Sequence, residues 1–106
     1  MITLKNYKEE LKGLCAVEIS GEGCANCISL MPVLSEITHR RGDIKMKHIE
    51  AAPETMELLQ LYDVDRVPTI LLTDNGVVFA RATGFQPEEI LEVWMDAKIE
   101  EHNLIK

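Results

Sequence analysis

A Cys-x-x-Cys pair, Cys24 and Cys27, lies at a point where the pattern of the chain changes. The apolar run Cys15–Ile19 comes before the pair, and the helical pattern Ile28–Thr38 follows it. Much later, Val67–Thr69 carries a proline that leads into another apolar run. A strand, two cysteines at the start of a helix and a proline before a second strand together predict a dithiol/disulfide redox site.

The positions of the two cysteines suggest different tasks. Thiol–disulfide exchange needs a thiolate, and the free N–H groups and dipole of a helix N-terminus stabilise a negative sulfur. Cys24 precedes the helix, so we expect it to be the exposed attacking thiol. Cys27 lies one turn inside and is expected to be the buried resolving thiol that releases a mixed disulfide. Asn26 either hydrogen-bonds the Cys24 sulfur or simply fills an exposed position in the first turn.

A metal site is the competing interpretation of the cysteine pair. Zinc takes four ligands, and the remaining candidates are Cys15, His39, His48 and His102, with no paired spacing among them. An iron–sulfur cluster needs four cysteine ligands, whereas the chain has three. We therefore favour redox chemistry, with Cys15 as a buried, inert residue and the three histidines at the surface.

The elements that must position these residues alternate between strand and helix patterns. Asn75-Gly76 separates two apolar runs, which is the strongest short signal for a hairpin. The last helix is expected to turn Ile90, Leu91, Trp94 and Ala97 inward. The expected elements are strand 2–4, helix 6–11, strand 15–20, helix 28–41 with Gly42 as its stop, strand 44–50, helix 53–62, strands 69–73 and 77–82, and helix 87–97. This β-α-β-α-β-α-β-β-α order predicts an α/β fold with a central mixed sheet sandwiched between α-helices.

Length and composition predict one domain over residues 1–106, with 46% hydrophobic residues available for a core. Eighteen acidic residues against 11 basic ones give a net charge of −7. That charge opposes binding to nucleic acid and to anionic membrane surfaces. No apolar stretch approaches a membrane span, and no basic segment followed by an apolar one marks a leader. The expected compartment is the cytoplasm, where a Cys-x-x-Cys pair is more often catalytic than structural.

Several motifs at fixed spacings now coincide. Pro32 lies five residues after Cys27, Glu18 lies six residues before Cys24, and Gly84 follows the hairpin. The segment Tyr62–Thr69 reads Tyr-Asp-Val-Asp-Arg-Val-Pro-Thr. With these motifs the chain resembles the thioredoxin family over essentially its whole length. It departs from the usual family pattern in three respects: Gly-Cys-Ala-Asn-Cys replaces Trp-Cys-Gly-Pro-Cys, a glutamate replaces the buried aspartate, and the aromatic lip over the cysteines is missing.

The resemblance implies a thioredoxin-like fold and a protein-disulfide reductase. Its redox centre would be a Cys24–Cys27 disulfide, with no other cofactor. Disulfide-containing proteins would be its substrates, and a thioredoxin reductase or another electron donor would recharge it. The alternative from a different class is a protein-interaction module that keeps the fold and its groove, with incidental redox activity.

Glu18 is an acidic residue inside an apolar strand, where a carboxylate is costly unless it is used or paired. Burial would raise its pKa and let it take the proton of Cys27 as that thiol attacks. The competing interpretation is a glutamate on a solvated strand face. Lys45 or Lys47 on the following strand is a possible partner, but the strand register cannot be fixed from the sequence.

Pro68 opens a predicted strand, where a trans proline is the ordinary expectation, since only about 5–6% of X–Pro bonds in folded proteins are cis. The resemblance implies a cis Val67–Pro68 bond instead. The backbone of Val67 would then pair with an extended substrate, a form of β-augmentation. Gly23, Ala25 and Gly84 would form the walls of this substrate groove.

Overall fold

The computed structural model describes residues 1–106 and contains one four-stranded sheet in the order β2-β1-β3-β4. Strands β1 and β2 run parallel, whereas β3 is antiparallel to both β1 and β4. In chain order the elements are α1 (Tyr7–Glu10), β1 (Leu14–Ser20), α2 (Ala25–Arg41), β2 (Lys45–Glu50), a 3₁₀ turn (Pro53–Thr55), α3 (Met56–Leu61), β3 (Thr69–Asp74), β4 (Val77–Thr83) and α4 (Glu88–Ile105). This confirms the predicted α/β class with a mixed sheet between helices.

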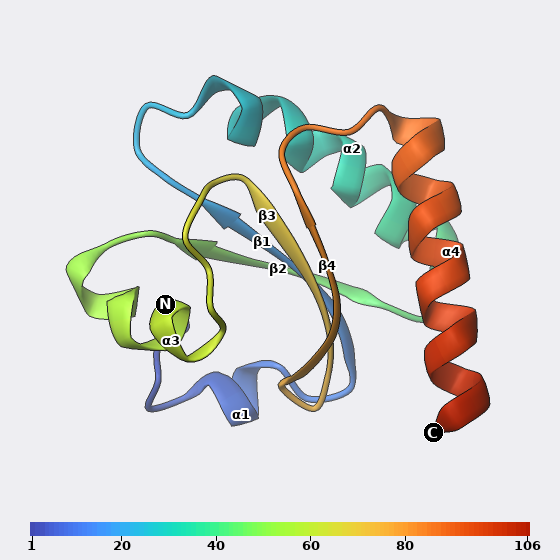
Figure 1. Cartoon of the computed structure of the whole chain (residues 1–106), viewed down its shortest axis with the longest axis horizontal. Coiled ribbons are helices and arrows are strands. Elements are labelled where there is room, and N and C mark those ends of the chain that lie inside the picture. Colours follow the sequence, from blue (N-terminus) through green and yellow to red (C-terminus); the bar gives the residue numbers. More distant parts are fainter.

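Two helix layers cover the two faces of the sheet (Figure 1). Helices α2 and α4 pack on one face, and α1 and α3 lie on the other. Successive residues of a strand point to opposite faces, so β1 contributes to both cores. Val17 and Ile19 pack with the α1/α3 side, whereas Ala16 packs with the α2/α4 side. The same alternation places Glu18 on the face that α2 covers.

The predicted first strand is wrong: residues 2–4 do not join the sheet. Their polar groups are satisfied by a local turn instead. The N–H of Thr3 donates to Oδ1 of Asn6 at 2.7 Å, and the Asn6 side-chain amide donates to the carbonyl of Met1 at 2.9 Å. Ile2 still packs into the core of the α1/α3 side, 7% exposed. In this Ile-Thr-Leu segment, Ile2 is therefore buried in the core without any strand pairing.

The termini of α2 follow the local chemistry of the sequence. Cys24 caps the helix at its start, and Gly42 ends it in the left-handed conformation at φ 74°. The N–H of Gly42 donates to the carbonyl of Thr38 at 3.1 Å, which satisfies one of the last free carbonyls. Pro32 lies inside the helix, on its exposed side. The helix thus begins at the cysteine pair, as predicted.

The hairpin and the last helix show one prediction confirmed and one in need of correction. Asn75 and Gly76 both have positive φ, 51° and 82°, as a two-residue hairpin between β3 and β4 requires. In α4, however, the buried residues follow a spacing of four: Leu91, Met95 and Ile99. Ile90 is 57% exposed and Ala97 is also exposed, because that spacing turns both away from α2.

None of the helices is both long and apolar enough to cross a bilayer.

Candidate active site

The cysteine pair sits where the loop after β1 turns into α2. Gly23 adopts φ 72°, a conformation that suits glycine, and this turn delivers Cys24 to the helix cap. Cys24 and Cys27 form a disulfide with their Cα atoms 5.3 Å apart. Cys24 is half-buried, whereas Cys27 is 2% exposed. The arrangement presents one sulfur at the surface and keeps the other beneath it.

The start of α2 is electrostatically suited to a thiolate. The N–H of Cys27 donates to Sγ of Cys24 at 3.2 Å, so a backbone donor already points at this sulfur. The first turn carries no acidic side chain that would oppose a negative charge. In the reduced protein, this donor and the helix dipole stabilise the Cys24 thiolate. Asn26 is exposed and its side chain makes no hydrogen bond, so Cys27, not Asn26, supplies the donor.

A second loop carries the proline of the predicted groove. The Val67–Pro68 bond is cis, which confirms what the resemblance implied. Val67 is 36% exposed, and its N–H and C=O make no hydrogen bond within the chain. Pro68 itself is buried, and its carbonyl accepts from the N–H of Gly84 at 2.9 Å. This bond joins the proline loop to the segment after β4.

Gly21 joins the same proline loop to the cysteine loop. A methyl group added at Gly21 would lie 3.0 Å from Cγ2 of Val67, closer than ordinary van der Waals contact, so the two loops pack closely at a residue without a side chain. Gly23 and Ala25 are exposed on the cysteine side of this contact. The structure therefore links three segments far apart in the sequence: residues 21–25, 67–68 and 84.

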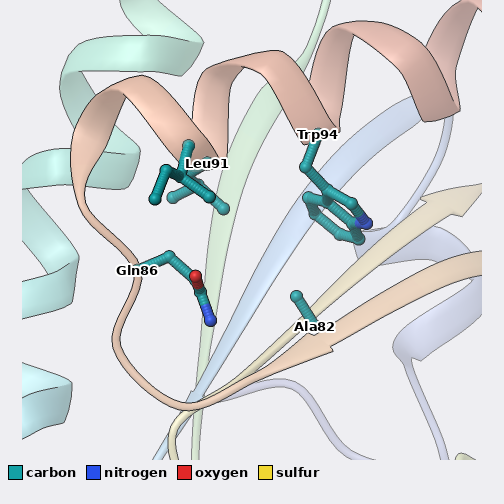
Figure 2. A pocket seen from close by; sticks show the side chains of 5 residues that line it. Ala82, Gln86, Leu91 and Trp94 are labelled. Carbon is teal, nitrogen blue, oxygen red and sulfur yellow. The ribbon is translucent and has the colours of Figure 1, made fainter.

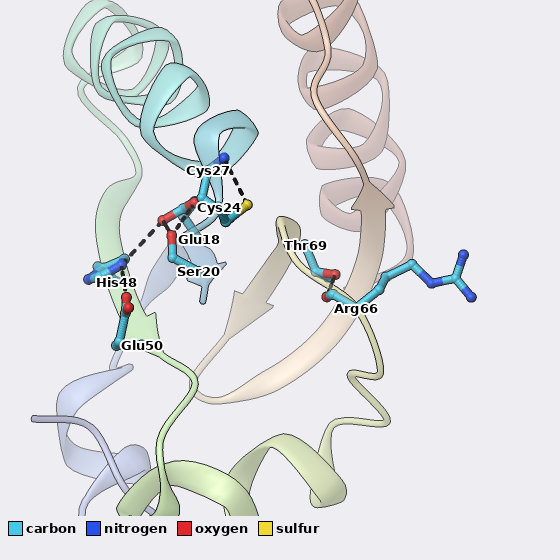
Figure 3. Close-up of a disulfide and its surroundings, with 8 residues drawn as sticks. All are labelled: Glu18, Ser20, Cys24, Cys27, His48, Glu50, Arg66 and Thr69. Atoms are coloured by element: carbon cyan, nitrogen blue, oxygen red, sulfur yellow. Dashed lines mark hydrogen bonds and ion pairs between the residues drawn. A yellow bond between two sulfur atoms is a disulfide. The ribbon is translucent and has the colours of Figure 1, made fainter. Parts of the chain in front are cut away.

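Glu18 is fully buried, at 0% exposure, so the interpretation as a solvated strand residue is wrong. The hydroxyl of Ser20 lies 2.7 Å from Oε1 and 2.6 Å from Oε2, and it donates to the carboxylate (Figure 3). Burial raises the pKa of Glu18, while the Ser20 hydrogen bond and nearby His48 oppose that rise. A raised pKa is what a proton acceptor for a thiol near neutral pH needs.

The side chain that lies beside Glu18 on β2 is His48, not Lys45 or Lys47. Strands β1 and β2 pair Glu18 with His48, and Nε2 of His48 lies 3.5 Å from Oε1 of Glu18. Because side chains alternate along a strand, the two lysines point to the opposite face of β2. The parallel register decides this partner. The sequence suggests His48 only as a possible metal ligand or a surface residue, and it does not point to Ser20. The only hint in the sequence was alternation: Ser20 lies on the same face of its strand as Ala16 and Glu18, and His48 lies on the same face of its strand as Met46.

A cavity of about 310 Å³ connects these groups. Its walls come from the end of β1, the cysteine loop, the start of α2 and the end of β2. The lining residues are Ser20, Gly21, Glu22, Gly23, Cys24, Cys27, Ile28, Met31, His48 and Glu50. Both cysteines, Ser20 and His48 thus line the same space.

The remaining chemistry-bearing residues lie elsewhere. Cys15 is a free, buried thiol whose pKa is raised by burial, as expected for an inert residue. His39 is exposed, as predicted. His102 is not a plain surface residue: its ring stacks on Phe79 at 3.9 Å, and Nε2 lies 2.9 Å from Oδ2 of Asp74. No group of three or more His, Cys, Asp or Glu side chains is arranged to hold a metal ion.

A second hollow, of about 180 Å³, lies between the end of β4 and the start of α4 (Figure 2). It is lined by Ala82, Gln86, Ile90, Leu91 and Trp94. None of these side chains is a nucleophile or titrates near neutral pH. The candidate site is therefore the cavity beside the cysteines. Trp94 is half-buried because it packs against the core on the α2/α4 side of the sheet.

Comparisons with known proteins agree with this geometry. The family described as Thioredoxin matches residues 1–97. The thioredoxin of Bacillus subtilis (strain 168) is 31% identical over 85 residues, which cover 79% of this chain and 81% of that protein. The thioredoxin of Listeria monocytogenes is 30% identical over 96 residues, covering 86% and 89%. Thioredoxin-like protein YdfQ of Bacillus subtilis is 29% identical over 92 residues, covering 87% and 80%.

Proposed function

The chain belongs to the thioredoxin family of thiol–disulfide oxidoreductases, and from this premise we propose a role for each residue of its site. The protein reduces protein disulfides through the pair Cys24 and Cys27, and its redox centre is part of the chain, so no cofactor is needed. Cys24 attacks the substrate disulfide, and Cys27 resolves the mixed disulfide. The observation that carries this assignment is the half-buried sulfur at the helix cap above one that is 2% exposed.

Glu18 receives the proton of Cys27 in this proposal. Its burial raises its pKa towards the range in which it can exchange protons with a thiol. Its carboxylate is bonded to Ser20, and Ser20 and Cys27 line the same cavity. Either a direct approach or a water in that cavity connects the thiol to the carboxylate.

Substrates bind along the proline loop. The free N–H and C=O of Val67 offer an extended peptide the hydrogen bonds of one added strand position. Gly23, Ala25 and Gly84 border this position without large side chains, and Pro68 fixes its backbone. Recognition through backbone favours many disulfide-containing proteins over a single one.

Family membership implies disulfide-containing substrates and a reductase partner in general terms. We propose more specifically that a thioredoxin reductase or a similar donor recharges the protein in the cytoplasm, where it serves electron transport and redox homeostasis. Residues 1–106 act as one domain in this scheme.

Insulin reduction with dithiothreitol as electron donor tests the function. The protein is expected to accelerate precipitation of the insulin B chain well above the rate of dithiothreitol alone. A protein that binds disulfide-containing partners but leaves that rate unchanged would instead be the interaction module that uses the Pro68 groove. The intact cysteine pair at a helix start favours the reductase.

Gly21→Ala tests the groove. The added methyl group meets Cγ2 of Val67 at 3.0 Å, so the Val67 side chain must give way by a few tenths of an ångström, and we expect this to disturb the proline loop. Overpacking of this kind costs about 1 kcal/mol or more, and we expect KM for insulin to rise about threefold to tenfold while kcat changes little. The double variant Gly21→Ala/Val67→Ala removes the clash and should restore KM. An unchanged KM in the single variant would show that substrates do not depend on this loop.

A further inference from the structure

His48 lies on β2 beside Glu18 of β1, and the two residues are paired in the parallel register. Its Nε2 atom is 3.5 Å from Oε1 of Glu18 and 3.5 Å from Oε2 of Glu50 (Figure 3). The side chains of Glu18, His48 and Glu50 are 0%, 38% and 47% exposed. The imidazole therefore stands between a carboxyl group with no access to water and one at the surface.

This position answers a need of the proposed mechanism. A proton that reaches Glu18 must leave before the next cycle, yet Glu18 has no exposed atom through which to lose it. Ser20, its hydrogen-bond partner, is only 4% exposed. The imidazole of His48 lies 3.5 Å from the Glu18 carboxylate, and His48 also lines the cavity beside Cys24 and Cys27.

We propose that His48 exchanges the proton of Glu18 with solvent in each redox cycle. The inference rests on the proposed role of Glu18 as the proton acceptor of Cys27. In the resolving step, the Cys27 sulfur forms a bond to the Cys24 sulfur, the bond from Cys24 to the substrate breaks, and the electron pair leaves on the substrate sulfur. The Cys27 proton passes to Glu18, then to Nε2 of neutral His48, and finally to water or Glu50. No further oxidant or reductant takes part.

The charges around the imidazole suit such an exchange. Glu18 faces it from β1, Glu50 from its own strand, and Glu22 borders the cavity from the loop before α2. Met1, with its α-amino group, lines a hollow on the other side of His48. From α2 the cavity receives Ile28 and Met31 and no charged side chain. Two carboxyl groups, those of Glu18 and Glu50, thus lie against the imidazole, and histidine ordinarily gains and loses its proton between pH 5 and 8.

A purely structural role for His48 makes a different prediction. If the ring only holds Glu18 in place, no small molecule in solution can replace it. If the ring moves a proton, free imidazole can enter the space left by His48→Ala and do the same. The cavity of about 310 Å³ and the exposed edge of the ring allow that entry.

The test measures repeated turnover of a quenched fluorescent disulfide peptide by the full-length protein between pH 5.5 and 9, with dithiothreitol in excess as electron donor. We expect His48→Ala to slow the reaction about tenfold at neutral pH. Added imidazole should restore the rate, and more basic methylimidazoles should restore it further. His48→Gln, which keeps a polar side chain of similar size, should show the same slowing without rescue. His39→Gln, at an exposed site on α2, serves as the matched control and should react like the wild type.

The outcomes separate this inference from the proposed function. A wild-type rate in both His48 variants, with slowing in Glu18→Gln, would overturn the role of His48 and keep that of Glu18. A wild-type rate in the Glu18 variant as well would remove the premise. Slowing of His48→Ala that imidazole does not relieve would make His48 a positioning residue only. If His48→Ala fails to fold, a wild-type pH profile in His48→Gln would still overturn the exchange.

Discussion

Replacing Cys24 with serine is expected to reduce insulin reduction to the rate of dithiothreitol alone. Cys24 holds the accessible sulfur at the start of α2, and a serine hydroxyl cannot attack a disulfide at neutral pH. Cys27→Ser should behave differently, because the attacking sulfur remains. That variant should form a mixed disulfide with its substrate and fail to release it.

Mass spectrometry distinguishes the two variants. Incubated with a disulfide-containing protein, Cys27→Ser should gain the mass of one substrate chain through Cys24, and Cys24→Ser should gain none. Brief labelling of the reduced wild-type protein with iodoacetamide should modify Cys24 first. Cys15→Ser is the control, since its thiol is fully buried and it should leave activity unchanged. Early labelling of Cys27 or Cys15 would reverse the assignment.

Glu18→Gln is expected to slow the resolving step about tenfold to hundredfold near neutral pH, as loss of a general base does. Wild-type Glu18 can accept a proton only when it is ionised, so the wild-type rate should rise with pH through its raised pKa. The glutamine variant should lose that one ionisation from its rate profile. Stopped-flow measurement of substrate release between pH 5 and 9 gives both quantities. Wild-type rates from pH 6 to 8 would mean that the thiol proton passes directly to water.

The same variant should alter stability with a defined sign. The folded protein holds the Glu18 proton more tightly than the unfolded chain, whose glutamate has an ordinary pKa of 4.5. The wild-type protein therefore loses stability as pH rises from 4.5 through the raised pKa, by about 1.4 kcal/mol for each tenfold difference in proton affinity. Glu18→Gln removes that loss, so its advantage in unfolding free energy should grow over this window and then stay constant. Urea denaturation at several pH values measures the difference.

A kinetic defect combined with a gain in stability would be difficult to explain by misfolding. Ser20→Ala provides the matched comparison, because it removes the hydrogen bond that lowers the pKa of Glu18 but keeps the carboxyl group. Its rate profile should shift to higher pH without losing an ionisation. If Glu18→Gln and Ser20→Ala lose the same unfolding free energy at every pH, the Glu18–Ser20 hydrogen bond serves packing alone and Glu18 does not titrate in the window described.

The sequence alone determined the parts that depend on local patterns. The Cys-x-x-Cys pair at a helix start follows from the change of period beside it, and Gly42 marks the end of that helix because only a residue tolerant of positive φ suits the cap. Asn75-Gly76 specified the hairpin for the same reason. The acidic residue Glu18 in an apolar run signalled a buried carboxylate, and the family resemblance supplied the cis Val67–Pro68 bond.

The tertiary structure decided which of these residues meet. His48 rather than a lysine lies beside Glu18 because a shift of one residue between β1 and β2 would turn the other face of the strand inward, and no local pattern fixes that register. Residues 2–4 do not form the predicted strand, because Thr3 hydrogen-bonds to Asn6 in a local turn. The Ile-Thr-Leu segment shows no sign of this turn. Gly21 and Val67 are 46 positions apart, and their contact exists only because β1 and β3 are neighbours in the sheet. The sequence therefore identified the separate segments of the site, whereas pairing between strands far apart in the sequence brought them together.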